Sequence, residues 1–138
     1  MIAHLNAVKA LIEGLGFEVW IADATGSKRW PRVTITPAYG RPGVDRPLSD
    51  DRADIDEDIR VTSAGLTPES ALGVAGRVRD VLSPGHGWGR LDVQGRSASL
   101  RFVRHELTNT DREAADTATN RFPTYTVETF RIVSTPID

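Results

Sequence analysis

Apolar residues at the start of the chain recur at three- and four-residue spacing, which is the stripe of an amphipathic helix. Gly14 and Gly16 follow this stripe and supply a stop signal. The pattern therefore predicts a helix over residues 2–15. Its apolar face is formed by Ile2, Leu5, Val8, Leu11 or Ile12, and Leu15.

The next two apolar patterns have a period of two, as half-buried strands do. Residues 17–22 alternate Phe17, Val19 and Ile21 with polar or larger neighbours, and residues 32–36 alternate before Pro37. The stretch between them, TGSKRWP, is typical of a turn. We therefore expect these two strands to pair as an antiparallel hairpin.

The middle of the chain combines a long loop, a strand and a helix. Residues 38–52 contain several Pro and Gly breakers and no periodicity, which predicts a long loop. A strand is expected over 58–65. Thr67, Pro68 and Glu69 then give a capping residue, a proline at the first helical position and an acid in the first turn. We expect this helix to bury Leu72, Ala75, Val78 and Leu82 and to end at Pro84–Gly85.

The last third of the chain is rich in strand patterns. Residues 90–95 and 98–107 predict a second hairpin that turns at Gln94–Arg96, and 108–123 predict a second long loop. A final strand over 125–135 places Phe130 and Ile132 on one face. The order of elements predicts an α+β fold with a mostly antiparallel β-sheet, two helices packed on one face and two long loops. Its length is that of a single domain over residues 1–138.

Composition excludes several classes of protein. The chain has no cysteine, so disulfides, thiolate chemistry and cysteine-ligated metals are excluded. No apolar run approaches the roughly 20 residues of a membrane span, and the N-terminus lacks the features of a signal peptide. A net charge of -2 gives no overall attraction to nucleic acid.

The charge is distributed unevenly along the chain. Residues 45–58 hold seven acids and two arginines, whereas the remainder is net positive. Only Lys9 and Lys28 among the seventeen basic residues are lysines, so the basic side chains are nearly all arginine. Arginine favours fork-like pairing with carboxylates and is enriched at protein interfaces.

The acidic stretch opens like a calcium loop but does not continue as one. Asp54, Asp56 and Asp58 match the first three ligand positions of an EF-hand. The required glycine is replaced by Ile59, and the required acid at the twelfth position is replaced by Gly65. An EF-hand is therefore excluded.

In a regular strand, Asp54, Asp56, Asp58 and Arg60 share one face, and Ile55, Glu57, Ile59 and Val61 share the other. This arrangement predicts an outward acidic ladder over a buried apolar face. Three interpretations stay open: a solvated surface, a magnesium-dependent carboxylate site, or a negative surface that repels DNA.

The other candidate sites lack the spacing that chemistry requires. Residues 83–90 are glycine-rich but follow a helix and lack the ending of a phosphate-binding loop. The three histidines lie far apart in the sequence, and no serine lies in a nucleophile elbow. The three tryptophans have no basic strand signature beside them. No catalytic residue, metal site or cofactor is predicted.

Several segments together resemble one known family. The N-terminal helix leads into FEVWIADATGSKRWPRVTITPA, IRVTSAGLTPESALGVAGRVRDVL follows, and the chain ends with RLDVQGR, SLRFVRHE and YTVETFRIVSTP. This order resembles the tail terminator (minor tail) proteins of long-tailed phages that infect actinobacteria, and is similar to the lambda-type terminators. The resemblance covers nearly the whole chain, and its motifs include no catalytic signature.

The resemblance implies a structural protein without enzymatic activity. Such proteins form a hexameric ring on the last ring of the tail tube, stop its polymerisation and present the surface that joins the head. The implied partners are copies of itself, the tail tube protein and a head-completion or neck protein. Assembly would occur in the host cytoplasm, away from membranes, and the ring would reside in the virion at the head–tail junction.

Two hypotheses place residues in that ring. DNA crosses its channel without specific binding, and Asp54, Asp56 and Asp58 are the candidates for a negative channel lining. The two long loops are the candidate contacts to tube and head proteins, through Arg41, Asp45, Arg46, Arg112 and Arg121. Two alternatives remain: another neck component, such as a head-closure or tail-completion protein, and a small magnesium-dependent carboxylate hydrolase or nuclease.

Overall fold

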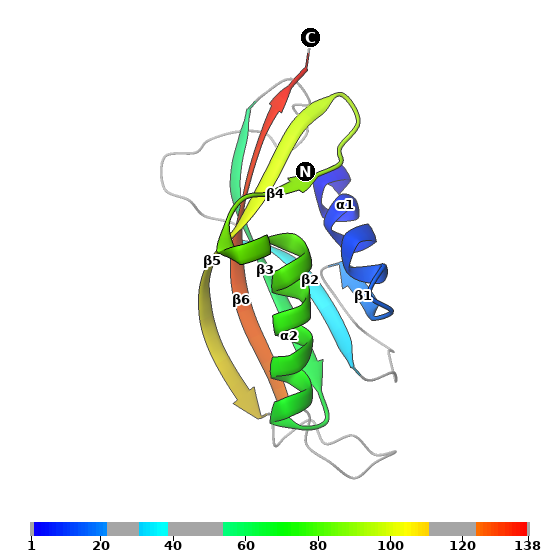
Figure 1. Cartoon of the computed structure of the whole chain (residues 1–138), viewed down its shortest axis with the longest axis vertical. Coiled ribbons are helices and arrows are strands. Elements are labelled where there is room, and N and C mark those ends of the chain that lie inside the picture. The colour runs from blue at the N-terminus through cyan, green and yellow to red at the C-terminus, as the bar shows by residue number, and fades with distance from the viewer. Residues whose placement is uncertain (1, 22–30, 39–53, 111–123, 138) are drawn as a thin grey trace.

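The computed structural model describes residues 2–21, 31–38, 54–110 and 124–137. In chain order the elements are α1 (Ile2–Glu13), β1 (Glu18–Ile21), β2 (Arg32–Ala38), β3 (Ile55–Gly65), α2 (Pro68–Leu82), a 3-10 turn (Pro84–His86), β4 (Gly89–Leu91), β5 (Arg96–Thr110) and β6 (Thr124–Pro136). The strands form one six-stranded sheet in the order β1-β2-β3-β6-β5-β4, and both helices pack on the same face of it (Figure 1). The expected α+β class is confirmed.

The first strand pair differs from the prediction. β1 and β2 are parallel, with the register running from Glu18–Arg32 to Ile21–Ile35, so they are not an antiparallel hairpin. A parallel pair needs a connection that returns along the length of the strand, and the turn-like composition of TGSKRWP did not suggest one. All the other strand pairs are antiparallel.

Several helix and turn boundaries lie where local sequence signals predicted them. The Thr67 side chain accepts a hydrogen bond from the Ser70 N–H at 3.1 Å, which caps the first turn of α2. Gly16 ends the turn after α1 with a φ of 92°, and Gly95 turns the β4–β5 hairpin with a φ of 75°. The predicted loops 38–52 and 108–123 lie mostly outside the described residues, although β5 extends to Thr110.

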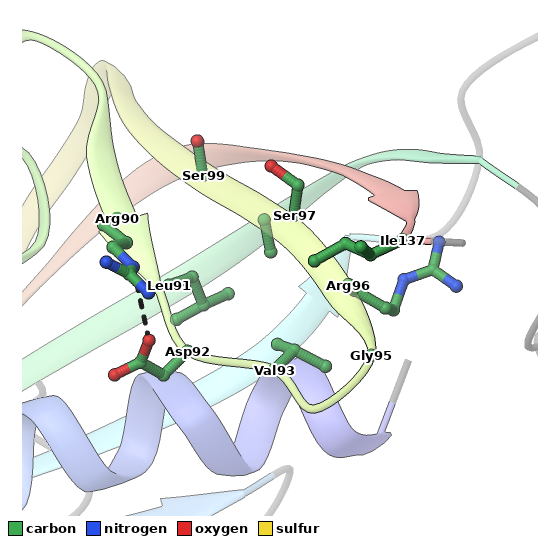
Figure 2. Close-up of a pocket in the computed structure, with 10 residues that line it drawn as sticks. Arg90, Leu91, Asp92, Val93, Gly95, Arg96, Ser97, Ser99 and Ile137 are labelled. Carbon is green, nitrogen blue, oxygen red and sulfur yellow. Dashed lines mark ion pairs between the residues drawn. The ribbon is translucent and has the colours of Figure 1, made fainter.

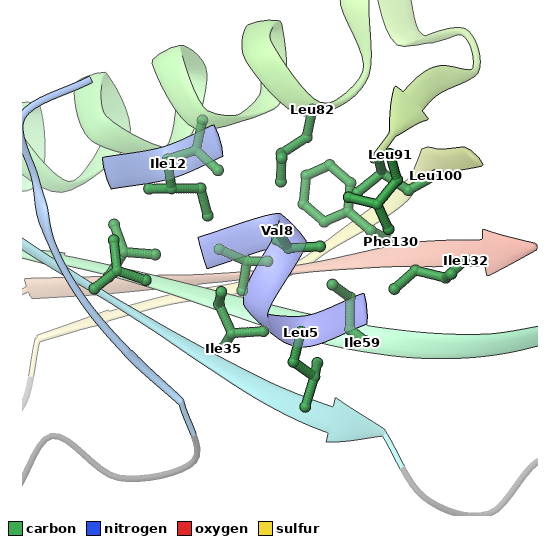
Figure 3. Close-up of a cluster of buried hydrophobic side chains, with 14 of the residues drawn as sticks. Leu5, Val8, Ile12, Ile35, Ile59, Leu82, Leu91, Leu100, Phe130 and Ile132 are labelled. Atoms are coloured by element: carbon green, nitrogen blue, oxygen red, sulfur yellow. The ribbon is translucent and has the colours of Figure 1, made fainter. Parts of the chain in front are cut away.

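The core lies between the helices and the inner face of the sheet, and Figure 3 shows α1 side chains pointing into it. Phe130 and Ile132 are fully buried at its centre, as predicted. Two predicted core residues are exposed instead: Ile2 is 67% exposed and Leu72 is 49% exposed. On α1 the buried position of the first turn belongs to His4, and on α2 it belongs to Ala71. Neither described helix is long and apolar enough to cross a membrane.

Candidate interaction surface

The face of the sheet opposite the helices, which we call the outer face, carries most of the charged strand residues. Alternation along β3 is as predicted: Ile59 and Val61 are buried on the inner face, whereas Arg60 is exposed on the outer face. The register with β6 and β5 extends the outer face across three strands. Asp58 lies opposite Arg131, and Arg131 lies opposite Arg101.

The acidic ladder is partly neutralised by an arginine from β6. Arg131 donates through Nε and Nη2 to the two carboxylate oxygens of Asp56, at 2.8 and 2.7 Å. The hydrogen bond and the charge of Asp56, together with the charge of Asp58, raise the pKa of Arg131. Both oxygens of Asp56 therefore face a guanidinium, which leaves that carboxylate poorly placed to ligate a magnesium ion.

The three predicted acidic positions thus differ. Asp54 precedes β3 and is exposed, Asp56 is half-buried in its ion pair, and Asp58 sits beside Arg131. The predicted contact residues Arg41, Asp45, Arg46, Arg112 and Arg121 lie outside the described residues.

A second charged cluster lies further along the outer face. Glu106 accepts hydrogen bonds from the Thr129 hydroxyl at 2.6 Å and from Arg104 at 3.2 Å, and it forms an ion pair with Arg60 at 3.2 Å. The Thr129 hydrogen bond and the two arginines lower the pKa of Glu106, against a smaller opposing effect of burial. This cluster therefore places two arginines, Arg60 and Arg104, around the Glu106 carboxylate.

The inner face holds a buried ion pair that the sequence did not predict. Arg79 on α2 donates to both oxygens of Glu128 on β6, at 3.3 and 2.7 Å, and Glu128 is 2% exposed. His105 Nδ1 lies 3.5 Å from the same carboxylate. The available signal was the alternation of β6, which puts Glu128 in phase with Phe130 and Ile132. This pair ties α2 to the sheet.

The histidines serve separate structural roles. His4 is buried and its Nε2 lies 2.9 Å from the Ser134 hydroxyl, while the His86 ring packs 5.2 Å from the Phe102 ring. Burial, aided by the charge of Arg96, lowers the pKa of His4 to about 4. No three His, Asp or Glu side chains converge on a metal-sized position within the described ranges.

A hollow of about 500 Å³ lies along the β4–β5 hairpin. Figure 2 shows its two cations at opposite ends: Arg90 pairs with Asp92, and Arg96 points away from them. Arg96 Nε also donates to the Ser134 hydroxyl at 2.6 Å. The two arginines therefore do not converge on one ligand.

Comparison with known proteins supports the fold. No protein-family profile and no curated protein sequence matches the chain. Among solved structures, the chain is similar to a chain from the virion of a native gene transfer agent particle. The TM-score is 0.50 at 17% sequence identity, and the match covers 91% of this chain and 84% of that chain. At this identity the likeness establishes a shared fold.

Proposed function

We propose that the protein is a structural component of a phage-type virion, and more specifically a tail terminator. It would form a ring, a homohexamer as the family resemblance implies, that caps the tail tube and ends its polymerisation. The observation that carries the proposal is the fold shared with a virion chain over most of both lengths. The terminator role itself rests on the order of sequence segments described above.

The chemistry of the described residues supports a role in contact rather than catalysis. Three carboxylates of the sheet, those of Asp56, Glu106 and Glu128, are each held by arginine. A catalytic or metal-binding carboxylate needs an oxygen directed at substrate or ion. The open, charged outer face instead has the composition of a polar contact surface.

The partners in this proposal are further copies of the chain, the tail tube protein and a head-completion protein. The loops 38–52 and 108–123 remain the predicted contacts to tube and head, through Arg41, Asp45, Arg46, Arg112 and Arg121. DNA would pass through the ring without specific binding. The site of action would be the head–tail junction of the virion after assembly in the host cytoplasm.

The channel-lining role of Asp54, Asp56 and Asp58 also remains a prediction. Replacing all three by Asn should leave the ring intact and slow or trap DNA during ejection, because the lining would repel a polyanion less. A loss of folding would instead overturn this role. The Asp56–Arg131 pair reduces the negative charge that such a lining would present.

The test of the function is a tube-capping assay. Tail tube protein from the same virion genome is polymerised with and without this chain, and tube lengths and ends are recorded by electron microscopy. We expect shorter tubes that each carry a ring at one end. Binding to the portal side of heads and not to tubes would favour another neck component. Failure to bind either structure would overturn the proposal.

A further inference from the structure

Besides the outermost strands β1 and β4, two strand segments lack a neighbour on one side among the described residues, and these two free edges lie on opposite sides of the sheet. The first belongs to the start of β3. β2 ends at Ala38, which pairs with Asp58, so residues 55–57 of β3 pair only with β6 among the described residues. Asp54 and Asp56 occupy this end on the outer face, and we call them the acidic edge.

The second free edge belongs to β5. β4 pairs with Ala98, Ser99 and Leu100 only, and the next outward N–H, that of Phe102, donates to the Ser83 hydroxyl at 3.0 Å. Beyond this point, in the part of the chain that the structure describes, β5 pairs only with β6. Arg101 and Arg104 lie on the outer face here, and we call them the arginine edge.

The charges at these edges are incompletely balanced within one copy. Arg101 lies directly opposite Arg131 on β6, and like charges in that position destabilise a strand pair. Arg131 is satisfied by Asp56, whereas Arg101 has no ion-pair partner among the described residues. Asp54 is exposed and likewise has no partner there. Each edge therefore presents a charge that a second molecule could neutralise.

We propose that the acidic edge of one copy binds the arginine edge of the next copy, with Asp54 facing Arg101. This inference rests on the proposed function, which requires copies to assemble. Because the two edges are different surfaces on opposite sides of the sheet, the contact is head-to-tail and can repeat around a ring. Arginine suits the role because its planar fork pairs with carboxylates.

The backbone of β5 indicates that side chains carry the contact. The register of β5 shifts between Phe102 and Arg104 and again between His105 and Leu107. Such bulges interrupt a regular ladder and discourage simple addition of another strand. The charged side chains on the outer face then determine which surface is accepted as a neighbour.

The experiment is a charge exchange read out by sedimentation velocity and native mass spectrometry over a range of protein concentrations. Asp54→Arg and Arg101→Glu are each expected to weaken self-association at least about tenfold, because each places like charges together. The double variant should recover most of the loss. Association of the wild-type chain should also weaken as salt rises.

A matched control changes the same residue types on the helical side. Arg77→Glu with Asp80→Arg also leaves the net charge unchanged, and both positions are exposed on α2. This variant should associate like the wild-type chain. Circular dichroism of every variant separates a lost contact from a lost fold.

Three results would overturn the edge contact: a wild-type chain that stays monomeric, single reversals without effect, or a double exchange that fails to recover. A monomeric chain that still caps tubes would leave the proposed function standing. A chain that associates through the two edges but caps no tubes would support the edge contact and overturn the proposed function. Asp54→Asn separates the two roles considered for Asp54, because the edge contact predicts weaker association and the channel lining predicts an intact ring.

Discussion

The two faces of the sheet each carry an arginine–carboxylate pair with nearly the same geometry. Arg79 and Glu128 on the inner face, like Arg131 and Asp56 on the outer face, meet through Nε and Nη2 with a shortest distance of 2.7 Å. Their surroundings differ: the Glu128 side chain is 2% exposed, whereas the Asp56 side chain is 38% exposed.

This difference assigns the two pairs different physical roles. A buried carboxylate has lost its water, so its arginine partner is needed to keep the fold. An exposed pair is still hydrated and adds little to stability, but its charge remains available to a neighbouring molecule. The inner pair is therefore expected to matter for folding and the outer pair for contacts.

The largest effect is expected from breaking the inner pair. Arg79→Ala should lower the free energy of unfolding by about 3 kcal/mol, because it leaves the buried Glu128 carboxylate without its charge partner. Urea denaturation measures this loss. The double variant Arg79→Met with Glu128→Leu removes both charges and should recover most of it. A single variant as stable as the wild-type chain would show that the inner face tolerates an unpaired charge.

An intermediate effect is expected from His4, which the inner face holds in its neutral form. The pKa of His4 is about 4 in the fold against an ordinary value of 6.5, so the unfolded chain takes up a proton first as the pH falls. The contribution of His4 to the free energy of unfolding should therefore be fully present above pH 6.5. It should decline by about 2 kcal/mol between pH 6.5 and 4.

The measurement for His4 is urea denaturation across that pH range, compared with His4→Gln. The variant lacks the titrating imidazole, so its profile should be flatter than that of the wild-type chain by the contribution of His4. Carboxylates that titrate near pH 4 affect both proteins alike. Parallel profiles would mean that His4 is protonated in the fold without cost.

The sequence predicted the inner apolar residues better than the polar ones, for a physical reason. Alternation in β3 and β6 is a local property, so it placed Ile59, Val61, Phe130 and Ile132 correctly. The pairing of Asp56 with Arg131 joins residues 75 apart and depends on strand register, which no local pattern contains. For the same reason the sequence predicted an acidic ladder but not its neutralisation.

The two main errors also arise from long-range structure. The direction of β1 relative to β2 depends on the packing of the whole sheet, whereas the turn residues alone favoured an antiparallel hairpin. At the start of α1, His4 takes the buried position that the apolar stripe assigned to Ile2, because Ser134 at the end of β6 offers it a hydrogen-bond partner. The predicted contact loops lie outside the described residues, so their roles stay predictions.

The smallest effect on folding is expected from the outer pair. Asp56→Asn removes the charge that Arg131 binds but keeps a side chain of the same shape, so the free energy of unfolding should fall by at most about 0.5 kcal/mol. The same urea measurement used for Arg79→Ala provides the comparison. A loss of 2 kcal/mol or more would contradict the assignment of this pair to the surface. With stability unchanged, any change in self-association of this variant would then report on the outer face alone.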